Sequence, residues 1–278
     1  MGSQVVGVRI FIATMDEPIY VGRMIRGIIN AYHLNIVGVA ILPGSPVSIR
    51  KGVQKIKDAI IFSIILGPTG LISTFMTLAH YRLRFLLSKL GYGNPYSIES
   101  LTKAYGIPCY RLRTLNNSKV LRLVKRLNPD LVINQAQVIL RKQFLDIPRI
   151  GTLNRHASLL PRYRGMMAPF WSILHNEQMS GVSIHFVDEQ IDHGPIVIQK
   201  TVPIKRFDTF IGLLERIFDI TPDAMLEAIE KISQGDYEQN LLPNEDSEAT
   251  YFSKPNLSDA LRYYSVIVRR FLYGTKKK

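Results

Sequence analysis

The densest group of chemically capable residues lies between positions 152 and 199. Asn154 and His156 stand two residues apart at the end of a predicted strand, so their side chains point to the same side of it. A histidine can take or give a proton near pH 7, and an asparagine amide can donate a hydrogen bond to an oxygen that gains negative charge. Asp192 lies in a turn after a second predicted strand, where its carboxylate would orient His156 and accept a proton from an amine. The spacing leaves one alternative open, in which Asn154 and His156 cap a loop and Asp192 serves only its turn.

Motifs for nucleotide and metal binding are absent from the sequence. No G-x-G-x-x-G follows the first predicted strand and no Gly-Lys-Ser/Thr occurs, so we expect neither a dinucleotide nor a nucleoside-triphosphate cradle. His185, Asp188, Asp192 and His193 are spread along a strand and the turn after it, where they need not converge. We therefore expect no metal site.

Strands and helices alternate along the chain in a way that would position these residues. Apolar strands are predicted over 5–13, 36–41, 107–110 and 131–134, with amphipathic helices between them, and further strands over 150–154, 182–187 and 196–204. This order predicts right-handed βαβ units and an α/β, Rossmann-like fold, with a mostly parallel twisted sheet and helices on both faces. Such sheets bind ligands outside the carboxyl ends of their strands, which is where Asn154 and His156 lie.

Composition limits the compartment and the partners. The 278 residues include 35 Lys+Arg against 22 Asp+Glu, a formal net charge of +13, and a single cysteine. One cysteine excludes a disulfide framework within the chain and fits a reducing, cytoplasmic location. A strongly basic protein favours an anionic partner, and composition alone leaves nucleic acid, an anionic membrane and a phosphorylated substrate open.

Two segments stand apart from the predicted catalytic domain over residues 1–235. An insertion-like apolar segment spans 56–90, and its residues 59–79 carry no charge. A core or lid helix pair is the favoured interpretation, because Gly67-Pro68 and Gly70 interrupt the run, while a membrane-surface segment and a membrane span are the alternatives. A short basic extension occupies 236–278, and its apolar residues recur at helical spacing among arginines and lysines. That pattern is typical of a helix packed on its own domain or lying on an anionic membrane.

Two motifs in this region resemble those of a known family. Residues 154–165 read N-x-H-x-S-L-L-P-x-Y-R-G, and residues 181–196 read G-V-x-I-H-F-V-D-x-x-I-D-x-G-P-I. Together and in this order they resemble the 10-formyltetrahydrofolate-dependent formyltransferases. The resemblance implies the formyltransferase fold and a folate-dependent N-formyltransferase that uses N10-formyltetrahydrofolate as formyl donor and no metal. Its catalytic set falls on Asn154, His156 and Asp192, which would stabilise the oxyanion and move a proton from the attacking amine.

The resemblance also implies residues that bind the two substrates. The folate pterin would lie between the loop after the middle strand and the loop that carries the catalytic aspartate. The matching positions are Val138, Ile139, Leu140, Val187, Asp188 and Asp192. The loop beside the active site supplies Arg162, Tyr163 and Arg164 as substrate-binding residues, since arginines suit anionic groups. A solvated basic loop is the alternative for these three.

Features of the individual subfamilies limit the classes of formyl acceptor that we expect. The purine enzyme of the family has a Gly-Ser-rich phosphate loop after its first strand, whereas residues 14–18 here include two acids. The tRNA enzyme carries a C-terminal barrel, for which a tail of roughly forty residues is too short, so we do not expect a nucleic-acid partner. The remaining layout is that of the sugar N-formyltransferases, which predicts the amine of a nucleotide-linked amino sugar as acceptor. Alternatives are another small amine, a lipid-linked amino sugar at the inner face of the membrane, and a tRNA acceptor; a homodimer is also open.

Overall fold

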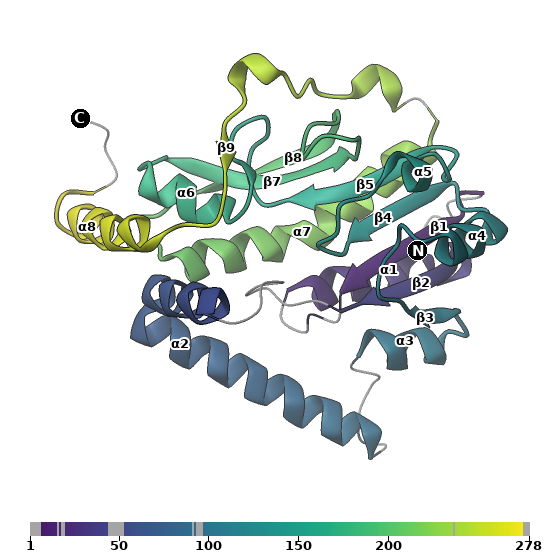
Figure 1. The fold of residues 1–278 in the computed structure, drawn as a ribbon, viewed down its shortest axis with the longest axis horizontal. Helices are drawn as coiled ribbons and strands as arrows, with labels where there is room; N and C mark the ends of the chain where they lie inside the picture. The colour runs from purple at the N-terminus through teal and green to yellow at the C-terminus, as the bar shows by residue number, and fades with distance from the viewer. Residues whose placement is uncertain are drawn as a thin grey trace.

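A seven-stranded sheet with helices on both faces forms the body of the protein (Figure 1). The structure is a computed structural model and describes residues 7–15, 17, 20–43, 53–90, 92, 97–235 and 237–274. The strands are β1 (Ile10–Met15), β2 (Ile36–Leu42), β3 (Cys109–Arg111), β4 (Leu131–Gln135), β5 (Gly151–His156), β6 (Arg164–Gly165), β7 (Met179–Phe186), β8 (Ile196–Pro203) and β9 (Tyr251–Phe252). The α-helices are α1 (Val21–Tyr32), α2 (Val53–Lys89), α3 (Ile98–Ala104), α4 (Ser118–Leu127), α5 (Lys142–Leu145), α6 (Ala168–Leu174), α7 (Phe210–Ser233) and α8 (Leu257–Tyr273).

The strand order β3-β2-β1-β4-β5-β7-β8 confirms the predicted α/β architecture. Strands β1 to β5 pair in parallel, while β7 and β8 are added antiparallel at one side. The order changes direction beside β1, whose neighbours are β2 and β4, as expected for a doubly wound sheet. The predicted first strand 5–13 starts too early, since β1 begins at Ile10; positions 5 and 6 lie outside the described residues.

Alternate residues of the central strands pack into two separate cores. On β1, Ile10 and Ile12 belong to the core that also holds α1 and α7, whereas Phe11 and Ala13 belong to the core under α4 and α5. Because successive side chains of a strand point to opposite faces, a strand buried on both faces reads as a continuous apolar run. This packing explains why β1 looks uniformly hydrophobic in the sequence and fixes the sheet that carries β5.

The apolar segment forms one long helix, α2, which is broken at its middle. Gly67 has φ of +62° and Pro68 follows it, so the helix consists of two arms joined at this break. The interpretation as a pair of helices is therefore right, but most of α2 lies outside the core. By length and composition the stretch Ile56–Ser88 could cross a membrane, and in its most apolar window 17% of the residues are buried in the protein.

Residues 240–253, which we call the C-terminal strap, run from the end of α7 across the edge of the sheet to α8 (Figure 1). Leu242 and Ile196 exchange two backbone hydrogen bonds of 2.8 and 3.0 Å. Further along, β9 pairs in parallel with β6, where a Cβ at Gly165 would lie 2.3 Å from the Phe252 carbonyl oxygen. Only glycine permits this approach. In the predicted extension over 236–278 the strap thus pairs with strands, while α8 packs on α6 and α2; residues 236 and 275–278 lie outside the described part.

Candidate active site

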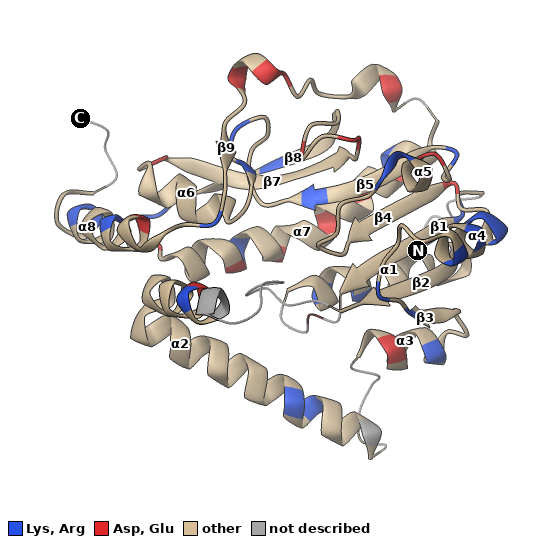
Figure 2. Ribbon diagram, viewed as in Figure 1, with Lys and Arg blue, Asp and Glu red and all other residues tan. Residues whose placement is uncertain are grey.

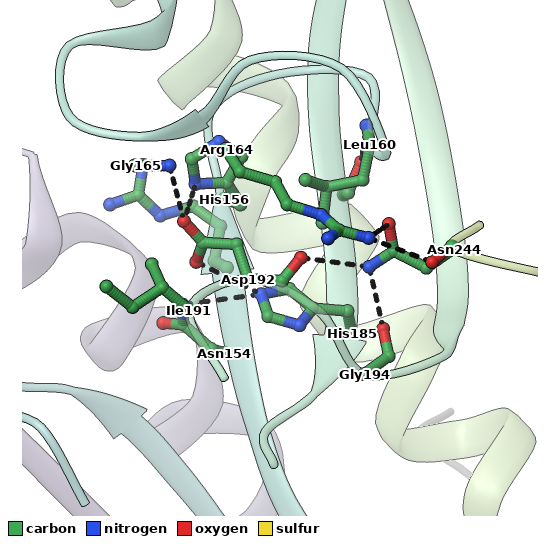
Figure 3. A network of polar contacts seen from close by, with 12 residues as sticks. Asn154, His156, Leu160, Arg164, Gly165, His185, Ile191, Asp192, Gly194 and Asn244 are labelled. Carbon is green, nitrogen blue, oxygen red and sulfur yellow. Dashed lines mark hydrogen bonds and ion pairs between the residues drawn. The ribbon is translucent and has the colours of Figure 1, made fainter. Parts of the chain in front are cut away.

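The structure brings Asn154, His156 and Asp192 together at one edge of the sheet (Figure 3). Asn154 and His156 are the fourth and sixth residues of β5, so both project from its carboxyl end. Asp192 lies in the loop between β7 and β8, and its Oδ2 is 3.3 Å from Nδ1 of His156. The side chains of His156 and Asp192 are about as buried as core residues, at 8% and 10% exposure. The alternative in which these residues only cap a loop does not account for a buried convergence.

Backbone geometry holds the Asp192 carboxylate in place. Asp192 has φ of +51°, a left-handed conformation that few residues other than glycine adopt. Its Oδ2 accepts a hydrogen bond of 2.9 Å from the backbone N–H of Gly165, and its carbonyl accepts one of 2.9 Å from Asn244 Nδ2. The loop after β5 and the C-terminal strap therefore fix Asp192 from two directions.

Both ring nitrogens of His156 face oxygen acceptors. Nε2 lies 2.7 Å from the carbonyl oxygen of Tyr163, and Nδ1 faces the Asp192 carboxylate. The Tyr163 backbone is left-handed, with φ of +63°, which turns that carbonyl toward the ring. A neutral ring can donate to only one of these oxygens, whereas a protonated ring donates to both. The surroundings thus suit a histidine that gains and passes on a proton beside Asp192.

Two residues that sequence reasoning missed orient the Asn154 amide. Gln135, at the end of β4, donates from Nε2 to Asn154 Oδ1 at 3.1 Å, and the Asn154 amide nitrogen lies 3.4 Å from Nε2 of His185. Arg155 in turn donates to Gln135 Oε1 at 3.1 Å. The Asn154 amide nitrogen carries two hydrogens, and among the described residues His185 takes one. The other is left for a substrate oxygen. In the sequence, Gln135 is recognisable only as a polar residue at the carboxyl end of β4, whereas His185 lies within the second motif.

His185 is held as a neutral ring. Its Nδ1–H donates to the Phe186 carbonyl at 2.7 Å, which leaves the Nε2 lone pair facing Asn154. Burial lowers the pKa of His185 to about 4; the nearby Asp192 carboxylate opposes this shift and His156 adds to it. The 3.7 Å contact with Asp192 Oδ1 is therefore not an ion pair at neutral pH.

This buried neutral histidine predicts a loss of stability in mild acid. An unfolded histidine titrates near pH 6.5, whereas folded His185 resists protonation to about pH 4, so the unfolded chain binds more protons between these values. The free energy of unfolding should fall by about 3 kcal/mol as the pH drops from 6.5 toward 4. Urea unfolding at several pH values measures this, and His185→Gln should flatten the dependence while His80→Gln, at an exposed position of α2, should not. An unchanged pH dependence in His185→Gln would contradict the assignment.

Comparison with known proteins finds a match over the segment of the chain that contains this site. The sequence profile described as Formyl transferase matches residues 91–229, which includes all three converging side chains. This chain belongs to the formyl transferase family. It is 34% identical to the methionyl-tRNA formyltransferase of Kosmotoga olearia over 60% of this chain and 53% of that protein. The chain thus spans about half the length of the curated relatives it matches.

Solved structures of formyltransferases share the fold of this chain. A sugar N-formyltransferase from Shewanella has a TM-score of 0.56 at 17% identity, covering 94% of this chain and 87% of its own. The N-formyltransferase from Helicobacter canadensis, solved in complex with folinic acid and dTDP-3-aminofucose, has a TM-score of 0.55 at 17% identity, covering 96% and 81%. At these identities the likeness shows the common fold.

The predicted folate-binding residues lie on two loops beside Asn154, His156 and Asp192. Val138 and Val187 pack against the same core as Leu140, which places the loop after β4 and the loop after β7 on one apolar base. Ile139 is 74% exposed and its carbonyl accepts a hydrogen bond from Asn116, so it offers a side chain rather than a free carbonyl. Asp188 binds His193 Nδ1 at 2.5 Å and shapes its own loop. The two loops therefore share an apolar base, and Ile139 adds an exposed apolar side chain to it.

The three predicted substrate-binding residues have different surroundings. Arg162 has a half-exposed side chain 2.5 Å from Glu177, and Tyr163 reaches the same carboxylate with its hydroxyl while its carbonyl serves His156. Arg164 is only 1% exposed, and its guanidinium donates to Asp246 Oδ1 at 2.6 Å and to Asn244. This corrects the expectation that Arg164 binds substrate. Its guanidinium is buried and bonded to residues of the C-terminal strap, so it is not exposed to a ligand.

Proposed function

We propose that this chain transfers the formyl group of N10-formyltetrahydrofolate to a primary amine. The observation that carries the proposal is the convergence of Asn154 with the largely buried His156 and Asp192 at the carboxyl edge of a formyl transferase fold. A neighbour of the same fold was solved with folinic acid, a formylated folate, which supports the choice of donor.

Each of the three side chains has a distinct task in this proposal. The bound folate supplies the formyl carbon, to which the amine nitrogen forms a bond as the bond to the folate nitrogen breaks. The free N–H of Asn154 donates to the formyl oxygen as it gains negative charge, and Gln135 and His185 keep that amide correctly oriented. Asp192 accepts the proton that the amine loses, and His156, 3.3 Å away, assists its passage to the departing folate nitrogen.

For the acceptor, we propose the amine of a nucleotide-linked amino sugar. A sugar N-formyltransferase and an N-formyltransferase solved with dTDP-3-aminofucose overlay 94% and 96% of this chain, which is consistent with this class. Such a substrate carries a diphosphate, which the net charge of +13 and the exposed Arg162 loop would attract. Methionyl-tRNA is the second candidate, favoured by the 34% identity to a methionyl-tRNA formyltransferase.

The test is a set of acceptor assays with the purified chain. The protein is incubated with 10-formyltetrahydrofolate and, separately, dTDP- and UDP-linked amino sugars, methionyl-tRNA and simple primary amines. Released tetrahydrofolate and the formylated product are followed by absorbance and mass spectrometry. Formylation of a nucleotide-linked amino sugar supports the full proposal, and formylation of methionyl-tRNA alone supports the reaction but overturns the acceptor. No formylation of any amine would overturn both.

A further inference from the structure

Helix α2 exposes apolar side chains on nearly all sides. In its second arm, from Pro68 onward, Gly70 is the only buried residue among those whose burial the structure describes, and Phe75 is 69% exposed. The large apolar side chains exposed on the whole helix are Ile56, Ile60, Leu71, Ile72, Phe75, Met76, Leu83, Leu86 and Leu87. A helix on the surface of a protein normally turns a polar face to water, and one that is apolar all round needs an apolar environment. The fold leaves this surface without a cover among the described residues.

Helix α8 presents a second apolar face beside it. Ala260, Tyr263 and Val266 are buried against the domain. Five of its exposed apolar residues follow one another at steps of four and three, namely Leu257, Leu261, Tyr264, Val268 and Phe271. The Tyr264 hydroxyl donates to the Ile64 carbonyl, and an open apolar groove of about 610 Å³ is lined by α2 residues and Tyr264. We call α2 and α8 together the apolar platform.

The charges around the apolar platform are almost all positive (Figure 2). No acidic residue occurs from 59 to 98, while Arg82 and Arg84 lie exposed on α2. On α8, Arg262 and Arg269 are exposed, and the one acid, Asp259, is used in the N-terminal cap, where it accepts from the Asn256 backbone N–H.

Aromatic and basic side chains also meet at the end of α8. Phe207, which is 67% exposed, lies 5.5 Å from the Phe271 ring, and the Arg206 guanidinium covers Phe207 at 5.3 Å. Tyr273 beside them is 79% exposed. Exposed aromatic residues next to arginines are typical of the region where a protein meets lipid headgroups.

We propose that the apolar platform binds the surface of an anionic lipid bilayer. Apolar side chains of α2 and α8 enter the headgroup region, and the arginines contact anionic headgroups. A second copy of the chain fits less well, because in a two-fold interface the same patch faces itself. The arginines of one copy would then meet those of the other without carboxylates between them. Anionic headgroups supply the missing negative charge.

The platform lies on the bilayer and does not cross it. The break at Gly67 prevents a straight span, and a contact between Phe62 and Phe210 ties the first arm to α7. Lys254, the residue after the C-terminal strap, also pairs with Asp58 at 3.3 Å. The uncharged part of the second arm, 68–81, is shorter than the roughly 20 residues that a span requires.

The experiment is sedimentation of the full chain with vesicles. Vesicles of phosphatidylcholine alone are compared with vesicles that also contain phosphatidylglycerol, at about 0.05 M and about 1 M salt. We expect binding to the anionic vesicles at low salt and its loss at high salt. Arg82→Ala with Arg84→Ala should weaken the binding about 10- to 30-fold, since each basic residue near the surface contributes.

Apolar variants separate membrane binding from self-association. Ile72→Asp, Phe75→Asp and Met76→Asp replace exposed residues and should abolish sedimentation, while Leu34→Asp, at a 78% exposed position outside the platform, should leave it unchanged. Thermal unfolding verifies that the variants fold. Absence of binding to anionic vesicles at low salt overturns the proposal, as does a dimer in light scattering that Phe75→Asp dissociates without any effect on vesicle binding. These readouts do not depend on formyl transfer, so the two proposals fail separately.

Discussion

Replacing His156 by alanine should lower kcat for formyl transfer by about 10²–10³-fold while the protein stays folded. The ring lies between the Asp192 carboxylate and the Tyr163 carbonyl, where it would assist the passage to the folate nitrogen of the proton that Asp192 accepts. Because His156 contacts oxygens and not the core of the sheet, its loss should affect chemistry more than folding. Single-turnover assays with saturating folate and acceptor measure the effect.

Companion variants make the result specific to the site. Asn154→Ala should cost a similar factor, since it removes the donor to the formyl oxygen, and the double variant should be little worse than either single one, as for residues that act as a unit. His80→Ala is the matched control because it removes an exposed histidine from α2. Near-normal turnover in a folded His156→Ala protein would contradict the assignment.

The sequence can reveal those residues of the site that lie close together along the chain, but not those whose contacts join distant segments. Asn154 and His156 share a strand and Asp192 follows in the second motif, so local spacing makes them candidates, and the family resemblance implies that they form the catalytic set. The parallel sheet is likewise predicted by strands that alternate with helices. Gln135 is different, because its role arises only when β4 and β5 pair and set Asn134 opposite Asn154. No local pattern distinguishes it from other polar residues at a strand end.

Arg164 shows why an arginine in a polar loop is hard to interpret from sequence. In the chain it stands near Arg162 in a basic loop, where solvent or an anionic ligand is the natural partner. In the fold its partners are Asn244 and Asp246, about eighty positions away, and they bury it. The same difficulty affects α2, whose apolar run predicts burial although most of the helix lies outside the core.

The contacts of Arg164 form a continuous path to the catalytic carboxylate. Arg164 donates to the Asn244 carbonyl and side-chain oxygens at 2.9 and 3.0 Å. Asn244 in turn donates from Nδ2 to the carbonyls of Asp192 and Gly194, both at 2.9 Å. These bonds support Asp192 in its left-handed conformation, so Arg164 and Asn244 act as positioning residues for it.

Asn244→Ala and Arg164→Ala should therefore each lower kcat by about 10- to 100-fold and leave KM for the acceptor nearly unchanged, because a small displacement of a catalytic group is costly. The double variant should be close to the single ones, since both break one path. Arg162→Ala is the contrasting variant: its guanidinium is half exposed, so loss of a substrate contact would raise KM for an anionic acceptor and spare kcat.

Because Arg164 is buried, Arg164→Met is measured beside Arg164→Ala, and thermal unfolding identifies the folded fraction. A rise in acceptor KM in Arg164→Met, with kcat retained, would show that Arg164 binds substrate after all, and independent, additive losses in the double variant would break the proposed path through Asn244.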